Sequence, residues 1–264
     1  MKLGFIGRND LPGVDADARF AAEHGFAGLE YNYWGDFAGL TSATVGTMRS
    51  LLDSHGVRAS ALGLWGWNHT SKDPAVRSEA QEMLGRAIEF AHKLGAEVLI
   101  TGGGDTGGGL EDNVLEFSKV FPPFLDRAAK AGLKVAFYAV HGNSFFDCLE
   151  AYEATWEKVP EVKIKYDPAN WLDHGDDYLE VVRRHGDKVG YVHIKEHLYH
   201  NGELVSQPAA GMGDIAWGKV FAFLYEHGYE GCLSMEPHGS KWSQGPLREK
   251  MLLLSQRYIL PFLG

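Results

Sequence analysis

The sequence predicts an α/β protein formed as one domain over residues 1–264, a (β/α)₈ TIM barrel with a parallel sheet. The first observation is that eight short apolar runs alternate with amphipathic runs along the chain. Strands separated by helices in this way form parallel crossover units, and eight units favour closure into a barrel over an open sheet. The second is length, because such a barrel takes about 250 residues and the chain has 264.

The expected strands are five to seven residues long and are rich in β-branched, aliphatic or aromatic side chains. In chain order they lie at residues 2–6, 27–31, 58–64, 97–101, 133–138, 162–167, 189–194 and 231–236. The stretches between them, such as ADARFAAEHG and WGKVFAFLYEHG, carry apolar residues at helical spacing. Several of these stretches end at a glycine in the position of a helix C-cap, namely Gly25, Gly56, Gly95, Gly132 and Gly228.

The composition of the chain indicates which classes of partner and which compartment to expect. The formal net charge of −10 disfavours nucleic acid as a partner, because phosphate binding requires a basic surface. Cys148 and Cys232 lie in no CxxC motif, so we expect reduced structural thiols. No run approaches the length of a membrane span and no cleavable leader pattern begins the sequence. We therefore expect a cytoplasmic protein with a small-molecule partner, as a monomer or a homo-oligomer.

Three polar residues stand at the last position of an expected strand or next to it, in the second half of the chain. They are Asp167 after VKIKY, His193 after GYV and Glu236 after GCLSM. In a parallel barrel the carboxyl ends of the strands converge on the face that holds the chemistry. Two carboxylates and an imidazole brought together there can bind a divalent metal ion. The alternatives are a capping or salt-bridged aspartate and a histidine satisfied within the core.

Other residues near strand ends are candidates for substrate binding. Glu30 either binds a substrate hydroxyl or pairs with a basic neighbour, and His141 is a candidate base, ligand or donor. Aromatic side chains near the same face either stack on a sugar ring or close the barrel as core. The expected substrate-binding set is Glu30, Trp65, Asn68, Tyr138, Lys195 and His238.

A glycine-dense segment, TGGGDTGGG at residues 101–109, follows the fourth expected strand. It lacks the GK[ST] ending of a phosphate-binding loop and does not match GxGxxG. Two interpretations remain open at this point, a flexible loop and a mobile flap over the site.

Six motifs resemble those of the sugar phosphate isomerase/epimerase superfamily, the xylose isomerase-like barrels. They are GFAGLEYN, LGAEVLITGGG, YDPAN, VHIKE, GMGDIAW and GYEGCLSMEPH. The resemblance implies one divalent ion bound by a Glu, an Asp, a His and a Glu from strands five to eight. Asp167, His193 and Glu236 match three of these positions. The chain departs at the fourth, where Tyr138 or Ala139 replaces the glutamate with His141 nearby, and Asn170 replaces a family histidine.

The resemblance implies an isomerase or epimerase that removes a proton next to the carbonyl of a sugar or keto-sugar. Glu236 or His141 would move the proton, assisted by Mn²⁺ or Mg²⁺, with Co²⁺, Zn²⁺ or Fe²⁺ as further options. A family epimerase uses two glutamates on opposite faces of the sugar, so the missing glutamate leaves open a one-base lyase or dehydratase acting on a keto-sugar or keto-inositol. A degenerate, non-catalytic sugar-binding barrel is also open. The acidic charge and the missing ligand argue against a DNA-repair endonuclease on the same fold.

Overall fold

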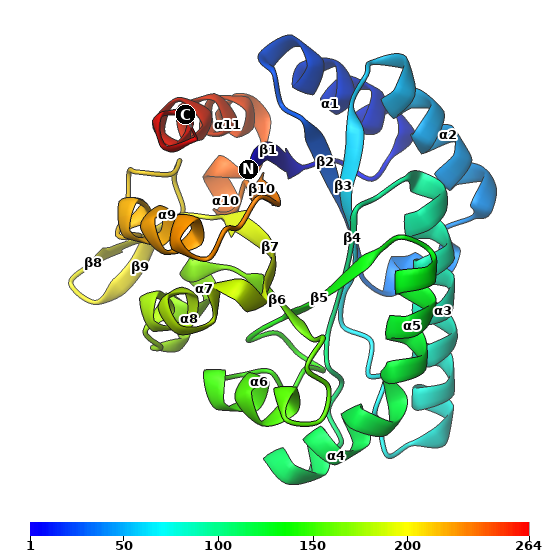
Figure 1. The fold of residues 1–264 in the computed structure, drawn as a ribbon. Coiled ribbons are helices and arrows are strands. Elements are labelled where there is room, and N and C mark those ends of the chain that lie inside the picture. Colours follow the sequence, from blue (N-terminus) through cyan, green and yellow to red (C-terminus); the bar gives the residue numbers. More distant parts are fainter. Residues whose placement is uncertain (264) are drawn as a thin grey trace.

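The structure is a computed structural model and describes residues 1–263. Within this range eight parallel strands close into a barrel in the order β1-β10-β7-β6-β5-β4-β3-β2. Helices surround the strands, as Figure 1 shows. The prediction of a (β/α)₈ TIM barrel is confirmed.

The barrel strands overlap the predicted ranges, and their ends differ from them by at most two residues. They are β1 (Lys2–Ile6), β2 (Gly28–Tyr33), β3 (Arg58–Leu64), β4 (Val98–Thr101), β5 (Lys134–Tyr138), β6 (Lys163–Tyr166), β7 (Val189–Ile194) and β10 (Cys232–Met235).

The helices that follow the strands begin and end as their caps require. Asp10 and Asp73 accept a backbone N–H at the start of α1 and α3, and Gly25 and Gly95 end these helices in the left-handed conformation. The α-helices are α1 (Leu11–His24), α2 (Ser42–Ser54), α3 (Pro74–Leu94), α4 (Leu110–Val120), α5 (Pro122–Lys130), α6 (Leu149–Trp156), α7 (Pro168–His174), α8 (Tyr178–His185), α9 (Trp217–Glu226), α10 (Gly239–Trp242) and α11 (Gly245–Ile259), and the 3₁₀ turns are η1 (Gly35–Gly39), η2 (Gly186–Lys188) and η3 (Leu260–Phe262).

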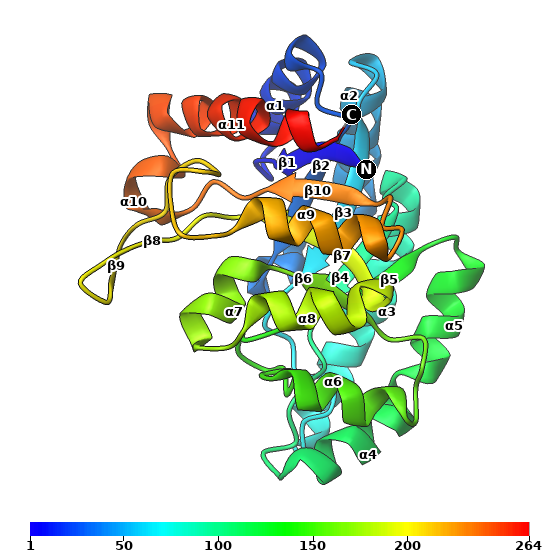
Figure 2. The ribbon, with the colours of Figure 1, turned by 60° about the vertical axis from the view of Figure 1, so that its left-hand side comes forward.

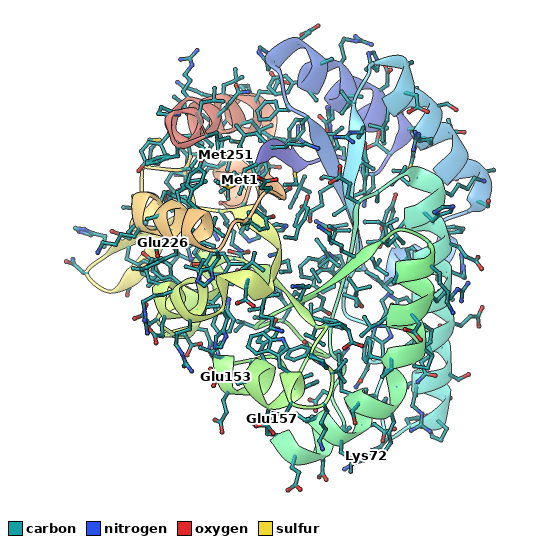
Figure 3. All side chains as sticks on the ribbon, in the orientation of Figure 1. Met1, Lys72, Glu153, Glu157, Glu226 and Met251 are labelled. Carbon is teal, nitrogen blue, oxygen red and sulfur yellow. The ribbon has the colours of Figure 1, made fainter. Side chains whose placement is uncertain are left out.

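Two apolar cores stabilise this arrangement. The larger one fills the layer between strands and helices, where side chains are densely packed in Figure 3 while Glu153 and Glu157 lie at the outer surface. The smaller one lies inside the barrel and comprises Ala61, Trp65, Val98, Ile100, Ala136, Tyr138, Tyr191 and Cys232. Because strand side chains alternate between the two faces, strands such as β3, β4 and β5 contribute to both cores. Cys148 and Cys232 are both free thiols, as expected.

A hairpin between β7 and α9 was not predicted. It consists of β8 (Leu198–His200) and β9 (Glu203–Ser206), joined by Asn201 and Gly202 at φ of 53° and 82°. Figure 2 shows it projecting from the barrel. Its strands are three and four residues long, shorter than the runs that indicate a strand, so they give a weak strand signal in the sequence.

The glycine-dense segment forms the loop between β4 and α4. Gly104 accepts a hydrogen bond from the Phe145 backbone at 2.8 Å, and Asp105 N donates to the Asn68 side chain at 2.9 Å. A Cβ at position 104 would lie 2.8 Å from the Thr70 backbone nitrogen, and its φ of 77° also favours glycine. Close approach between loops therefore explains this glycine; the flap stays a prediction.

None of the described helices is both long and apolar enough to cross a membrane.

Candidate functional site

Six charged side chains converge at the carboxyl ends of four strands. Glu30 lies on β2, Lys165 on β6 and His193 on β7, while Asp167, Lys195 and Glu236 stand one residue after β6, β7 and β10. On β6 and β7 these residues are two apart, so alternation turns both members of each pair to the same face. We call Glu30, Lys165, Asp167, His193, Lys195 and Glu236 the charged cluster.

Asp167 is the centre of this cluster. Its side chain is 2% exposed, and its Oδ2 lies 2.9 Å from Lys165 Nζ and 3.2 Å from Lys195 Nζ. The other oxygen accepts the Asn170 backbone N–H at 3.3 Å, so Asp167 also caps α7. Burial raises the pKa of the Asp167 carboxyl, but the two ammonium groups outweigh burial and hold it well below its usual value. Asp167 is therefore an ionised, paired carboxylate.

His193 lies between carboxylates on both sides of its ring. Nε2 is 2.9 Å from both oxygens of Glu30, and Nδ1 is 2.8 Å from Glu236 and 3.6 Å from Asp167. Burial lowers the pKa of His193, but Glu30 and the other carboxylates raise it to about 10. Glu30 is fully buried and pairs with His193, a basic neighbour, while a substrate-binding role for Glu30 stays a prediction.

Glu236 is the carboxylate of the cluster that solvent reaches. Its side chain is 16% exposed, whereas Asp167 and Glu30 are at 2% and 0%. One oxygen faces His193 and Lys195, at 2.8 and 3.6 Å, and the other lies 3.0 Å from His238 Nδ1. Burial raises the pKa of Glu236, but Lys195 and His193 hold it well below its usual value. Glu236 is an ionised carboxylate at the mouth of the barrel.

A hydrogen-bonded chain connects the cluster to His141. Lys195 Nζ donates to Asn170 Oδ1, and the Asn170 amide nitrogen lies 3.1 Å from His141 Nε2. Because the amide can only donate there, His141 Nε2 is an acceptor and its proton resides on Nδ1. Burial, together with Lys165 and Lys195, lowers the pKa of His141 to about 4. His141 is thus a neutral imidazole at pH 7.

Aromatic side chains form the opposite wall of the mouth. Trp65 stacks on Tyr138 with ring centroids 4.3 Å apart, and Trp34 stacks on the other side of Trp65 at 5.7 Å. Trp65 Nε1 donates to Asn32 Oδ1 at 2.7 Å, and the Asn32 amide donates to Glu30 at 2.8 Å. We call Trp34, Trp65 and Tyr138 the aromatic wall. Asn32, which joins it to the charged cluster, was not predicted from the sequence.

Two predicted substrate-binding residues lie farther from the cluster. The Asn68 amide contacts the backbone of Asp105 as donor and acceptor, which ties two loops together. His238 is exposed and reaches the cluster only through Glu236. A substrate-binding role for either residue stays a prediction.

Donors for a divalent ion are present, but the surrounding charges do not suit one. Ligand atoms of Asp167, His193 and Glu236 lie within 4.8 Å of one another. Glu30 is hydrogen-bonded to His193 Nε2, in the way that a carboxylate often orients a metal-bound histidine. However, Lys165 and Lys195 already contact the oxygen of Asp167, and β5 ends in Tyr138, close to where the resemblance predicts a glutamate. This is a candidate metal site whose charge, as it stands, does not fit a resident ion.

Lys165 is the main residue that sequence reasoning missed. It was read only as part of the strand KIKYD. The signal was present, because Lys165 lies two residues before Asp167 and must share its face.

The xylose isomerase-like TIM barrel family profile matches residues 18–257 of this chain. The chain belongs to this family. It is 27% identical over 260 residues to a ketose 3-epimerase of Arthrobacter globiformis, covering 91% of this chain and 84% of the relative. This relative supports the prediction of an enzyme of the sugar isomerase and epimerase kind.

Solved structures confirm the fold. A D-allulose 3-epimerase from Methylomonas sp. in complex with D-allulose superposes with a TM-score of 0.80 at 21% identity, over 99% of this chain and 96% of the other. The IOLI protein with a bound zinc atom superposes with a TM-score of 0.78 at 16% identity, over 100% and 98% of the two chains. At such identities the likeness shows the fold alone.

Proposed function

We propose that this protein is an isomerase or epimerase that acts on a ketose by removing a proton from the carbon next to the carbonyl. The observation that carries the proposal is Glu236, an ionised carboxylate that is reachable from solvent and lies beside Lys195 and His193. A base next to positively charged groups is what formation of an enediolate requires. The ketose 3-epimerase relative favours a ketose as the substrate.

The proposed step is balanced within the substrate and Glu236. The carboxylate takes the proton, the electron pair of the C–H bond forms a C=C bond, and the carbonyl oxygen becomes an oxyanion. Return of a proton to the same carbon from the opposite face, with re-formation of the carbonyl, yields an epimer. Return to the former carbonyl carbon, with transfer of the neighbouring hydroxyl proton to the oxyanion, yields an isomer. His141 is the candidate for the second group, because it lies against the aromatic wall and is linked to Lys195 through Asn170. It must take up a proton from solvent before it can return one to the substrate.

The divalent ion stays a prediction. Asp167, His193 and Glu236 would hold Mn²⁺, Mg²⁺ or a similar ion, and such an ion polarises a carbonyl as a Lewis acid. Because the two lysines already neutralise these carboxylates, no step above depends on it.

Proton removal can be measured without knowing the product. We would incubate the protein with D-allulose and a panel of other ketoses in D₂O and follow exchange of the C–H next to the carbonyl by NMR. Wild type should exchange at least one ketose, and Glu236→Gln should slow exchange by about 10²- to 10⁴-fold, the usual contribution of a general base. The matched control is Glu230→Gln, which changes an exposed glutamate at the other end of the same strand.

The same spectra separate the alternatives. A lyase or dehydratase, which needs one base only, would show loss of water and a new double bond instead of an epimer or aldose. Saturable sugar binding with no exchange for any ketose would contradict the proposal and favour a non-catalytic barrel.

A further inference from the structure

Two buried ammonium groups lie where the cluster is most negative. Lys165 is 1% exposed, 2.9 Å from Asp167 Oδ2, and its Nζ lies 5.5 Å from the Trp65 ring. Lys195 is 4% exposed and contacts Asp167 at 3.2 Å, Glu236 at 3.6 Å and Asn170. A lysine ammonium has three N–H donors, and Lys195 has three acceptors around it.

Two lysines already neutralise part of the negative charge of the cluster. The carboxylates of Glu30, Asp167 and Glu236 carry three negative charges, and Lys165 and Lys195 carry two positive ones. A divalent cation bound to neutral His193 would leave a net charge of +1 in a largely buried site, and burial of unbalanced charge is costly. An ion bound to Asp167 Oδ2 would also share that oxygen with both lysines.

We propose that Lys165 and Lys195 take over the work of a divalent ion at this site. Lys165 is a positioning residue that balances the buried Asp167. Lys195 is the catalytic electrophile that stabilises the oxyanion formed when Glu236 removes the proton. The inference rests on the proposed function, because it assigns the electrophile of the same reaction.

The position of Lys195 suits this role. Before proton transfer the negative charge resides on Glu236, 3.6 Å from the ammonium. After transfer Glu236 is neutral and the charge resides on the substrate oxygen. An ammonium group that can reach both keeps a charged partner throughout, so its interaction with the substrate becomes strongest as the oxyanion forms. Lys165 cannot do the same, because Trp65 and the barrel interior enclose it.

The first test is metal binding, which does not depend on activity. Purified wild type should hold less than one equivalent of metal after incubation with Mn²⁺ and dialysis. Lys165→Met should bind Mn²⁺ at least about tenfold more tightly than wild type, because it removes a like charge next to the ion. The matched control is Lys163→Met, which alters the lysine two residues earlier on β6, at the opposite end of the barrel, and should leave Mn²⁺ affinity unchanged.

The second test is deuterium exchange. Excess chelator should leave the wild-type rate within about twofold. Lys195→Met should lower kcat for exchange by about 10²- to 10³-fold with little change in KM, the loss expected for an oxyanion donor, and Mn²⁺ should not restore it. Lys195→Arg should recover part of the rate, and Lys241→Met, an exposed lysine on α10, should behave as wild type.

Three results would overturn the inference. They are a stoichiometric ion in wild type whose removal abolishes exchange and whose return restores it, an unchanged Mn²⁺ affinity in Lys165→Met, and a wild-type rate in Lys195→Met. If Lys165→Met fails to fold, Lys165→Gln keeps a donor toward Asp167 and serves in its place. Absence of exchange in wild type, with and without Mn²⁺, would instead refute the proposed function, while Mn²⁺ titrations still test the lysines.

Discussion

Two sides of one barrel mouth differ in how they are stabilised. Strands β2, β6, β7 and β10 contribute the charged cluster, in which every carboxylate contacts a basic side chain. Strands β3 and β5 and the adjoining loops contribute the aromatic wall, whose rings stack 4.3 and 5.7 Å apart. Removing one member of the cluster leaves a buried charge without a partner, whereas removing part of the wall loses contact area. Under the proposed function, the base Glu236 and the electrophile Lys195 belong to the charged side, and the aromatic side is the candidate binding surface.

Two buried histidines show the same contrast. His193, among carboxylates, has a pKa raised to about 10 because Glu30 and its neighbours outweigh burial. His69, behind the aromatic side, lies 3.1 Å from the Ala80 carbonyl and 3.0 Å from the Thr101 hydroxyl, and burial lowers its pKa to about 4. The residue type is the same, and the charge of its neighbours decides whether it is a cation.

The largest effect is expected from Asp167→Asn. This change leaves Lys165 buried without its carboxylate, so the free energy of unfolding should fall by about 3–5 kcal/mol, as for other broken buried pairs. Urea unfolding followed by circular dichroism measures it. The matched control is Asp177→Asn, which also alters an aspartate that caps a helix, but an exposed one. Asparagine caps as well as aspartate does, so this variant should be near wild type. Equal losses of unfolding free energy in the two variants would show that Asp167 stabilises the protein by capping α7 and not by pairing with Lys165.

The next largest effect is the loss of stability that His69 causes at acidic pH. The unfolded chain takes up a proton at this residue near pH 6.5, whereas the folded protein does so only near pH 4. Stability from this group is present above pH 6.5 and is lost as the pH falls through 4, by at most about 3 kcal/mol. His69→Gln should remove that part of the acid dependence, measured by urea unfolding at a series of pH values, and His92→Gln is the exposed control. His193 has the opposite sign, with its contribution complete below pH 6.5 and lost as the pH rises through about 10.

Trp34→Leu tests the aromatic wall as a binding surface, because Trp34 is 50% exposed whereas Trp65 is buried and stacks on Tyr138 and Trp34. Loss of one stacking face should raise KM for the ketose by about tenfold and change kcat much less, because this contact is the same in the ground state and the transition state. Steady-state exchange kinetics measure both. Trp156→Leu, a half-buried tryptophan on α6, is the control. A fall in kcat as large as that of Glu236→Gln would contradict the assignment of the aromatic wall to substrate binding alone.

Tyr138→Phe should have the smallest effect. The hydroxyl accepts one hydrogen bond from Gly66 N at 3.1 Å, so its loss should cost about 1 kcal/mol. Urea unfolding measures this change, and a loss as large as that of Asp167→Asn would contradict the contrast between the two sides.

The barrel could be predicted from the sequence because the alternation of strands and helices is a local pattern. Sequence reasoning also found Asp167, His193 and Glu236, since a polar residue at the end of an apolar strand is conspicuous. It missed Lys165, although period two places that residue beside Asp167. It left the role of Glu30 open, because its partner His193 is 163 residues away and is fixed only by the order of strands around the barrel. The β8–β9 hairpin was missed because its strands are only three and four residues long, too short for an alternating pattern to be recognised.

Closure of the barrel has a consequence for the growing chain on the ribosome. β1 pairs with β10, with Lys2 opposite Cys232, so the first strand must wait for the last one to be synthesised. Until then the edges of β1 and β7 can pair with other chains. His193 also lacks its neighbour Glu236 at this stage. A nascent or truncated chain that lacks β10 therefore carries lysines and aspartate without the carboxylate that faces solvent. If the proposed function holds, deuterium exchange would report that β10 has paired with β1 and closed the barrel.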